Sequence, residues 1–106
     1  MVADLGPVPP ALAAARVEID RIDSELIALL KARFAVAERV VGIKREAGLP
    51  ALLQDRVDEV IANVRAHAAA EGVPPEVAEA LWRQLIAATI AYEERHLGPS
   101  APTAAG

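Results

Sequence analysis

A long apolar seam near the start of the chain constrains its fold more than any other feature. Between Leu12 and Ala47 there is no proline, and the first glycine is Gly42. Eleven positions spaced alternately three and four residues apart run through this stretch, and ten of them are apolar. Such spacing is typical of one helix that packs lengthwise on others. The eleven positions are Leu12, Ala15, Ile19, Ile22, Leu26, Leu29, Arg33, Val36, Val40, Ile43 and Ala47.

The length of this helix predicts a second chain. At about 1.5 Å per residue, residues 12–47 would extend roughly 54 Å. A compact domain of about 100 residues has a radius of gyration near 13 Å, so the helix would project beyond its own domain. Two shorter helices cannot cover such a seam. We therefore expect an intertwined two-fold homodimer.

The rest of the chain reads as two more helices, which makes the fold class all-α with three helices per chain. Gly48 and Pro50 are signals that end the first helix, and Pro75 suits a first helical position. The expected second helix runs from Leu53 or Gln54 to about Glu71, and the third from Glu76 to about Leu97. We expect one domain over residues 11–97, with a disordered lead-in at 1–10 and a disordered tail at 98–106.

Composition excludes several classes of function. The net charge of −4 argues against a nucleic-acid partner, and no apolar run approaches the length of a membrane span. The chain has no cysteine, and His67 and His96 have no second ligand at metal spacing, so no metal site is expected. No secretion signal is visible at the start. These observations together predict a cytoplasmic protein.

Arg33 is the one charge in the apolar seam. A buried guanidinium requires an anion, because leaving it unpaired costs several kcal/mol. Lys44 lies eleven residues further on, which places it on the same helix face about 16 Å away. Together the two cations could bracket a small dianion. For Lys44 a second interpretation, an exposed cation whose stem lies along apolar surface, stays open.

Four other polar residues are candidates for the same site, each with a structural alternative. Thr89 and Glu93 lie one turn apart on the apolar stripe of the third helix, where Glu93 could equally neutralise a core cation. Arg56 opens the second helix, as an anion ligand or as an ordinary surface charge. Arg16 lies too far from Arg33 to share its ligand within one chain. It could enter the partner's site in an antiparallel dimer, or pair with Asp20.

These residues together resemble the all-helical class of chorismate mutases over about residues 12–97. The matching pattern is Arg16, then IDRIDSELIALLKAR ending at Arg33, GIK ending at Lys44, Arg56, and LWRQLIAATIAYE ending at Glu93. The resemblance implies an intertwined homodimer with two equivalent sites. Each site would use Arg33, Lys44, Arg56, Thr89 and Glu93 of one chain and Arg16 of the other.

The resemblance also implies a reaction, the Claisen rearrangement of chorismate to prephenate, which needs no cofactor. The three arginines would hold the two carboxylates of the substrate. Lys44 would donate to the ether oxygen, and Glu93 would donate from the other side. Many relatives have glutamine there, whereas Glu93 can donate only when protonated. Activity is therefore expected to fall as the pH rises.

Leu53 and Val57 depart from the common pattern. Ordinary members of the family carry acidic residues at these two positions, around the ring hydroxyl of the substrate. An apolar pair cannot bind that hydroxyl through side chains. Two side branches therefore stay open as alternatives: mutases that act on 4-amino-4-deoxychorismate, and isochorismate-pyruvate lyases that form salicylate. The spacing from Lys44 to Arg56 matches the ordinary mutases and favours chorismate. A third alternative is a non-catalytic helical dimer that regulates a partner enzyme.

Overall fold

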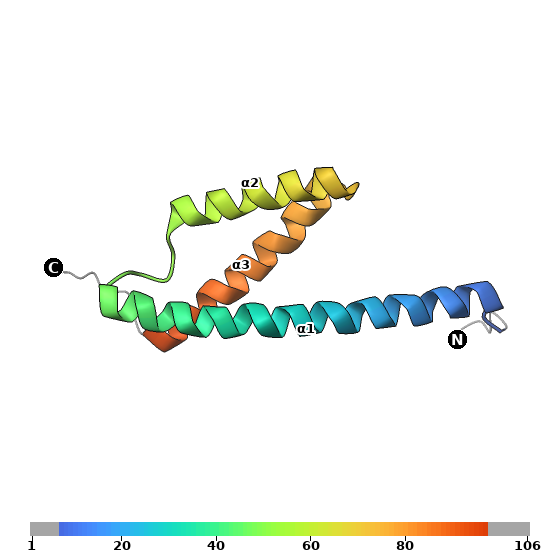
Figure 1. Ribbon diagram of the computed structural model, residues 1–106, viewed down its shortest axis with the longest axis horizontal. Coiled ribbons are helices and arrows are strands. Elements are labelled where there is room, and N and C mark those ends of the chain that lie inside the picture. Colours follow the sequence, from blue (N-terminus) through green and yellow to red (C-terminus); the bar gives the residue numbers. More distant parts are fainter. Residues whose placement is uncertain (1–6, 98–106) are drawn as a thin grey trace, which may run out of the picture. The chain divides into compact units, whose positions relative to one another are not determined.

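The computed structural model describes residues 7–97, and within that range the chain consists of three α-helices. They are α1 (Pro10–Ala47), α2 (Gln54–Glu71) and α3 (Pro75–Leu97), drawn in Figure 1. No strand occurs in residues 7–97, so the all-α prediction is confirmed. The disorder expected of residues 1–6 and 98–106 lies outside the described residues.

Helix α1 begins at Pro10, two residues before the expected start at Leu12. The reason is that proline lacks only an N–H group that the first helical turn would leave unpaired. The carbonyl of Pro9 accepts a hydrogen bond from the Ala13 N–H at 3.0 Å and so closes the first turn. The predicted long helix is confirmed, and its start lies inside the expected lead-in.

Glycine ends α1 and α2 in the same way. Gly48 has φ 71° and Gly72 has φ 81°, the left-handed conformation that residues with a Cβ rarely adopt. After each glycine the backbone turns back on the helix: Leu49 N–H donates to Lys44 O, and Val73 N–H to Ala68 O, both at 2.8 Å. These bonds satisfy carbonyls that the last helical turn would leave unpaired. They also fix where the two connections leave their helices.

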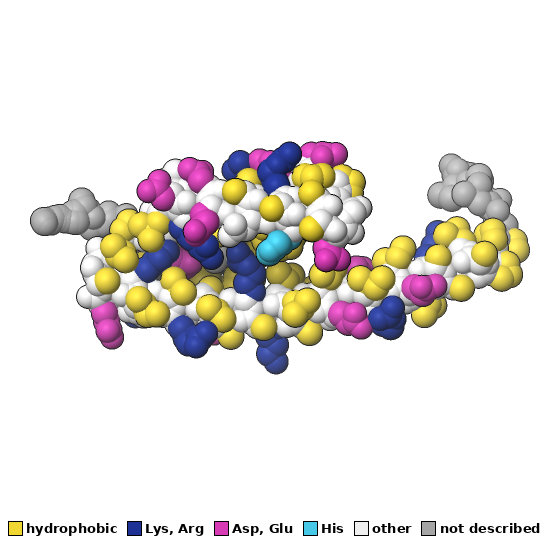
Figure 2. Space-filling model, turned by 45° about the horizontal axis from the view of Figure 1, so that its top comes forward, with side chains coloured by type: hydrophobic (Ala, Val, Ile, Leu, Met, Phe, Trp, Pro, Cys, Tyr) yellow, Lys and Arg dark blue, Asp and Glu magenta, His cyan; other side chains and the backbone are white. Residues whose placement is uncertain are grey.

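The chain divides into two compact units, residues 1–34 and 35–106, and α1 contributes to both. Among residues 7–34, the described part of the first unit, α1 is the only helix, so its apolar seam has no other helix there to pack on. The side chains of Leu12, Ile19, Ile22, Leu26 and Leu29 are 44–66 % exposed. Figure 2 shows hydrophobic side chains at intervals along this helix. The seam is therefore available to another chain, and the homodimer stays a prediction.

In the second unit, α2 and α3 contact each other over a core of small and branched side chains. This core agrees with a composition that contains one Phe, one Tyr and one Trp. Its small side chains allow close approach of helices but bury little area each. The buried apolar residues are Ala37, Val41, Ala51, Ile61, Ala68, Ala78 and Ile86.

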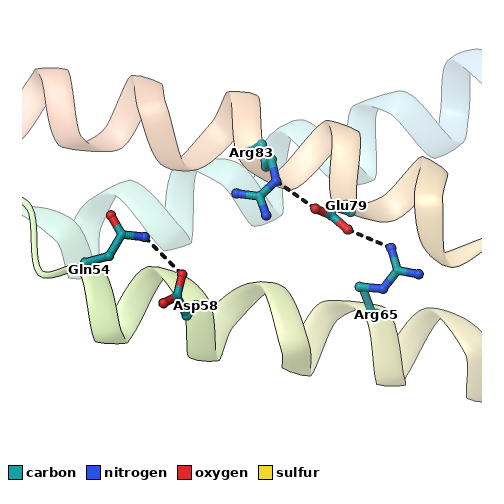
Figure 3. Close-up of polar contacts among 5 residues, drawn as sticks. All are labelled: Gln54, Asp58, Arg65, Glu79 and Arg83. Atoms are coloured by element: carbon teal, nitrogen blue, oxygen red, sulfur yellow. Dashed lines mark hydrogen bonds and ion pairs between the residues drawn. The ribbon is translucent and has the colours of Figure 1, made fainter.

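An ion-pair bridge joins α2 to α3 near the connection between them (Figure 3). The Glu79 carboxylate accepts from Arg65 Nη1 at 2.6 Å and from Arg83 Nε at 2.7 Å. Hydrogen bonds from Arg83 and then Arg65 lower the pKa of Glu79 from its ordinary value of 4.5. The same close-up shows Gln54 Nε2 donating to Asp58 at 2.9 Å within α2. The bridge therefore stabilises the α2–α3 hairpin when Glu79 is ionised.

We predict that Glu79→Gln lowers the melting temperature at neutral pH. Because folding lowers the pKa of Glu79, its stabilising effect is present above the ordinary value of 4.5 and is lost as the pH falls through the folded value. The melting-temperature gap between wild type and variant, followed by circular dichroism, should therefore close in acid. Glu94→Gln, which changes an exposed glutamate of the same helix, is the control. A gap that persists unchanged at acid pH would contradict this role.

Candidate active site

A buried ion pair between α1 and α3 forms the centre of the candidate site. Lys44 Nζ lies 2.8 Å from Glu93 Oε1, and the two side chains are only 13 % and 7 % exposed. Lys44 stands in the last turn of α1, and Glu93 four residues before the end of α3. Both residues belong to the unit formed by residues 35–106. The structure thus brings together two predicted site residues that are far apart in the sequence.

A backbone carbonyl also holds the Lys44 ammonium. Lys44 Nζ donates to Ala51 O at 2.7 Å, and Ala51 is buried in the connection between α1 and α2. An ammonium has three N–H donors. Two of them are accounted for by Ala51 O and Glu93 Oε1. Lys44 is thus held in place by two acceptors, and the exposed-cation alternative is wrong.

The pair also supplies the cation that the structural alternative for Glu93 requires. Removing a carboxylate from water costs several kcal/mol unless a cation and hydrogen bonds compensate it. Lys44 supplies both at Glu93 Oε1. Glu93 therefore does neutralise a cation within its own unit, as its structural alternative required. That role does not exclude a function, because a ligand that bound Lys44 would compete for the same contact.

Thr89 lies one turn before Glu93 on α3, so the two side chains share a face of the helix. The Thr89 side chain is half-buried, and its hydroxyl donates to Leu85 O at 2.8 Å. A hydroxyl that donates to its own helix still has lone pairs that accept hydrogen bonds. Thr89 is consequently suited to contact a polar group near Glu93, and its role in binding stays a prediction.

The start of α2 contributes three of the predicted residues. Leu53 is the N-cap residue and makes no side-chain cap, while its carbonyl accepts from Arg56 N–H at 3.0 Å and from Val57 N–H at 3.2 Å. The side chains of Leu53 and Val57 are half-buried. Arg56 is exposed and pairs with Glu59 at 2.5 Å. Exposed pairs of this kind contribute at most about 1 kcal/mol, so Glu59 leaves Arg56 able to exchange partners.

Arg16 and Arg33 belong to the other unit, residues 1–34. Arg16 is exposed, and its proposed pairing with Asp20 does not occur; the ion pair on this part of α1 joins Arg21 and Glu25 at 3.0 Å. Arg33 is half-buried, which agrees with its place in the apolar seam. The functional roles of both arginines stay predictions.

Two features of the site were not anticipated from the sequence. One is the Ala51 carbonyl, because every residue carries such an acceptor and no side-chain pattern marks the one that is used. The other is a polar cluster beside the ion pair, formed by Glu38, Arg45, Tyr92 and His96. The sequence feature that could have indicated this cluster is Arg45, a basic residue in the last turn of α1 directly after Lys44.

The described part of the chain contains neither a candidate metal cluster nor a helix that could span a membrane. Residues 7–97 contain no group of three His, Cys, Asp or Glu side chains placed to hold a metal ion. His67 and His96 are both exposed, as expected. Over the same range, each helix is either too short or too polar to cross a membrane.

The fold and the ion pair define a small all-helical protein with a buried lysine–glutamate centre between its first and last helices. Comparison with known protein families identifies the family to which the chain belongs. The family model described as chorismate mutase type II matches residues 15–94, a range that includes all eight predicted site residues. The chain belongs to the chorismate mutase type II family.

Two curated relatives resemble the chain over part of their own length. The bifunctional chorismate mutase/prephenate dehydratase of Aquifex aeolicus (strain VF5) is 34 % identical over 93 residues, which cover 81 % of this chain and 26 % of the relative. The T-protein of Enterobacter agglomerans is 35 % identical over 75 residues, covering 71 % of this chain and 20 % of the relative. The chain thus spans about a quarter or less of each of these proteins.

Proposed function

We propose that the chain is a chorismate mutase that converts chorismate to prephenate. The observation that carries the proposal is the Lys44–Glu93 pair, because it joins the two residues that the family resemblance assigns to the ether oxygen of the substrate. Membership of the chorismate mutase type II family supports the same reaction. A cytoplasmic location is part of this proposal.

The proposed mechanism relies on positioning and charge. The rearrangement is intramolecular, so the protein supplies a cage that holds the reacting ends of the substrate together and stabilises charge at the ether oxygen as its bond breaks. The third N–H of Lys44 is directed to that oxygen. Its other two donors are already bound to Ala51 O and Glu93 Oε1, so little reorganisation accompanies the reaction. Thr89 contacts a polar group of the substrate one turn away.

The arginines complete this proposal. Arg56 exchanges its exposed partner Glu59 for a substrate carboxylate. Arg33 of the same chain and the partner subunit's Arg16 bind the remaining carboxylate oxygens. The partner is a second copy of this chain, and the exposed apolar seam of residues 12–29 supports it, since that surface needs a matching apolar surface.

Leu53 and Val57 support a second set of candidate substrates. Both side chains are half-buried at the start of α2, where the resemblance implies contact with the substrate's ring. Apolar side chains give the ring hydroxyl of chorismate no hydrogen bond. Isochorismate, with pyruvate elimination to salicylate, and 4-amino-4-deoxychorismate are therefore the alternatives to chorismate.

The first prediction from the proposed function concerns the product formed from each substrate. Incubated separately with chorismate, isochorismate and 4-amino-4-deoxychorismate, the purified chain should convert chorismate fastest, with prephenate identified by chromatography and mass. Salicylate from isochorismate, or faster conversion of the amino compound, would instead assign one of the alternatives. Turnover of none of the three would overturn the enzymatic proposal and favour a regulatory dimer.

The second prediction concerns the proton on Glu93. In the structure Glu93 accepts a hydrogen bond from Lys44, whereas donation to the substrate requires a protonated carboxyl. If Glu93 donates this proton to the substrate, kcat should fall as the pH rises. Glu93→Gln carries permanent N–H donors, so its kcat should vary little over the same range. Pre-steady-state or steady-state rates between pH 5 and 9 test this, and parallel pH profiles for both proteins would contradict the role of Glu93.

The third prediction tests whether a site is shared between chains. Arg16→Ala and Lys44→Gln should each be nearly inactive alone. Refolded together in equal amounts, they should regain about a quarter of wild-type activity, because half the dimers are mixed and each mixed dimer has one intact site. If Arg16 served its own chain, every site would contain one defect and no activity would return. Circular dichroism and sedimentation of each variant provide the folding controls.

A further inference from the structure

A polar cluster holds the end of α3 against α1 beside the candidate site. Arg45 Nη2 donates to His96 O at 2.6 Å, and Tyr92 Oη donates to Glu38 Oε2 at 3.4 Å. His96 Nδ1 donates in turn to Tyr92 O at 2.8 Å, and the two rings lie 4.2 Å apart. These contacts flank Glu93 on both sides in the sequence. All of the residues belong to the unit formed by residues 35–106.

The contact made by Arg45 is of a kind that stabilises helix ends. His96 is the last residue but one of α3, so its carbonyl has no partner within the helix. A guanidinium that donates there satisfies this carbonyl and interacts favourably with the negative end of the helix dipole. The hydrogen bond is charge-assisted, and such bonds are stronger than neutral ones. Arg45 therefore caps α3 from a different helix.

The sequence positions couple this cap to the candidate site. Arg45 follows Lys44 directly on α1, and His96 lies three residues after Glu93 on α3. Consecutive residues of α1 thus bind α3 at two points less than one helical turn apart. Two contacts so close together prevent the last turn of α3 from fraying or rotating, either of which would draw the Glu93 carboxylate away from Lys44.

Tyr92, which precedes Glu93 in the sequence, makes a third contact between α3 and α1, its hydrogen bond to Glu38. Burial, and then the neighbouring charge of Glu38, raise the pKa of Tyr92 above its ordinary value of 10.0. The phenol therefore keeps its proton at neutral pH and remains a donor to Glu38. Since Tyr92 also carries the ring against which His96 lies, the cluster connects α1 to the last two turns of α3.

We propose that Arg45 is a positioning residue for the reaction: by capping α3 at His96, it holds Glu93 at hydrogen-bond distance from Lys44. This inference rests on the proposed function, because it concerns the rate at that same site. In this proposal Arg45 donates to His96 O and not to the substrate. Its loss should therefore lower kcat, with a much smaller change in KM.

The test compares kcat and KM for Arg45→Ala, Arg45→Lys and Arg39→Ala. Arg45→Ala should lower kcat about tenfold, because small misplacements of catalytic groups are costly. Arg45→Lys retains a cationic donor and should recover part of that loss. Arg39→Ala removes an exposed arginine of the same helix and should match the wild type. Equal kcat for Arg45→Ala and Arg39→Ala would overturn the proposal.

A double-mutant cycle distinguishes positioning from a general loss of structure. If Arg45 acts through Glu93, Arg45→Ala should have little further effect on kcat once Glu93→Ala is present. The same fold-loss in both backgrounds would overturn the proposal. Hydrogen exchange gives a readout that needs no turnover: in Arg45→Ala the amides of residues 93–97 should exchange faster, while those of α2 stay unchanged. Unchanged exchange at 93–97 would reject the cap even if the wild type proved inactive on every substrate.

Discussion

Lys44 and Glu93 are withdrawn from water together, and the second unit of the chain is arranged so that they meet. Either charge alone would be costly to bury, so the end of α1, the connection to α2 and the end of α3 must come together for the pair to be satisfied. Replacing such a pair with apolar residues is often neutral for stability. Stability alone therefore does not account for the pair, which is consistent with the proposal that it binds a substrate.

The fold was largely predictable because its signals are local. The apolar seam of α1, the left-handed glycines at 48 and 72 and the proline at 75 each act within a few residues, and the helices agree with them to within two residues at each end. The start of α1 differs because a proline that is unfavourable inside a helix is harmless at its first position. The second chain was inferred from the length of the first helix and from the family resemblance, and the exposed seam agrees with that inference without testing it.

The site was only partly predictable, because its contacts span long distances in the sequence. Lys44 was singled out because it shares a helix face with Arg33, and Glu93 because it lies on an apolar stripe. No periodicity indicates that two such residues on different helices meet. No role was predicted for Arg45, a basic residue in the last turn of α1. Its partner is a backbone oxygen, and backbone acceptors have no sequence signature. Side-chain patterns can therefore indicate which charges are buried but not what satisfies them.

The bond from Lys44 to the carbonyl of Ala51 has a consequence for how this protein can vary. A peptide oxygen is present whatever the side chain, so the contact itself places no demand on the amino acid at position 51 beyond the small volume of that buried place. It does demand a constant path for the four residues between Gly48 and Leu53, since one inserted or deleted residue would carry the oxygen away. This contact thus restricts the length of the connection more than the side chain at position 51, whereas surface loops usually tolerate changes in length.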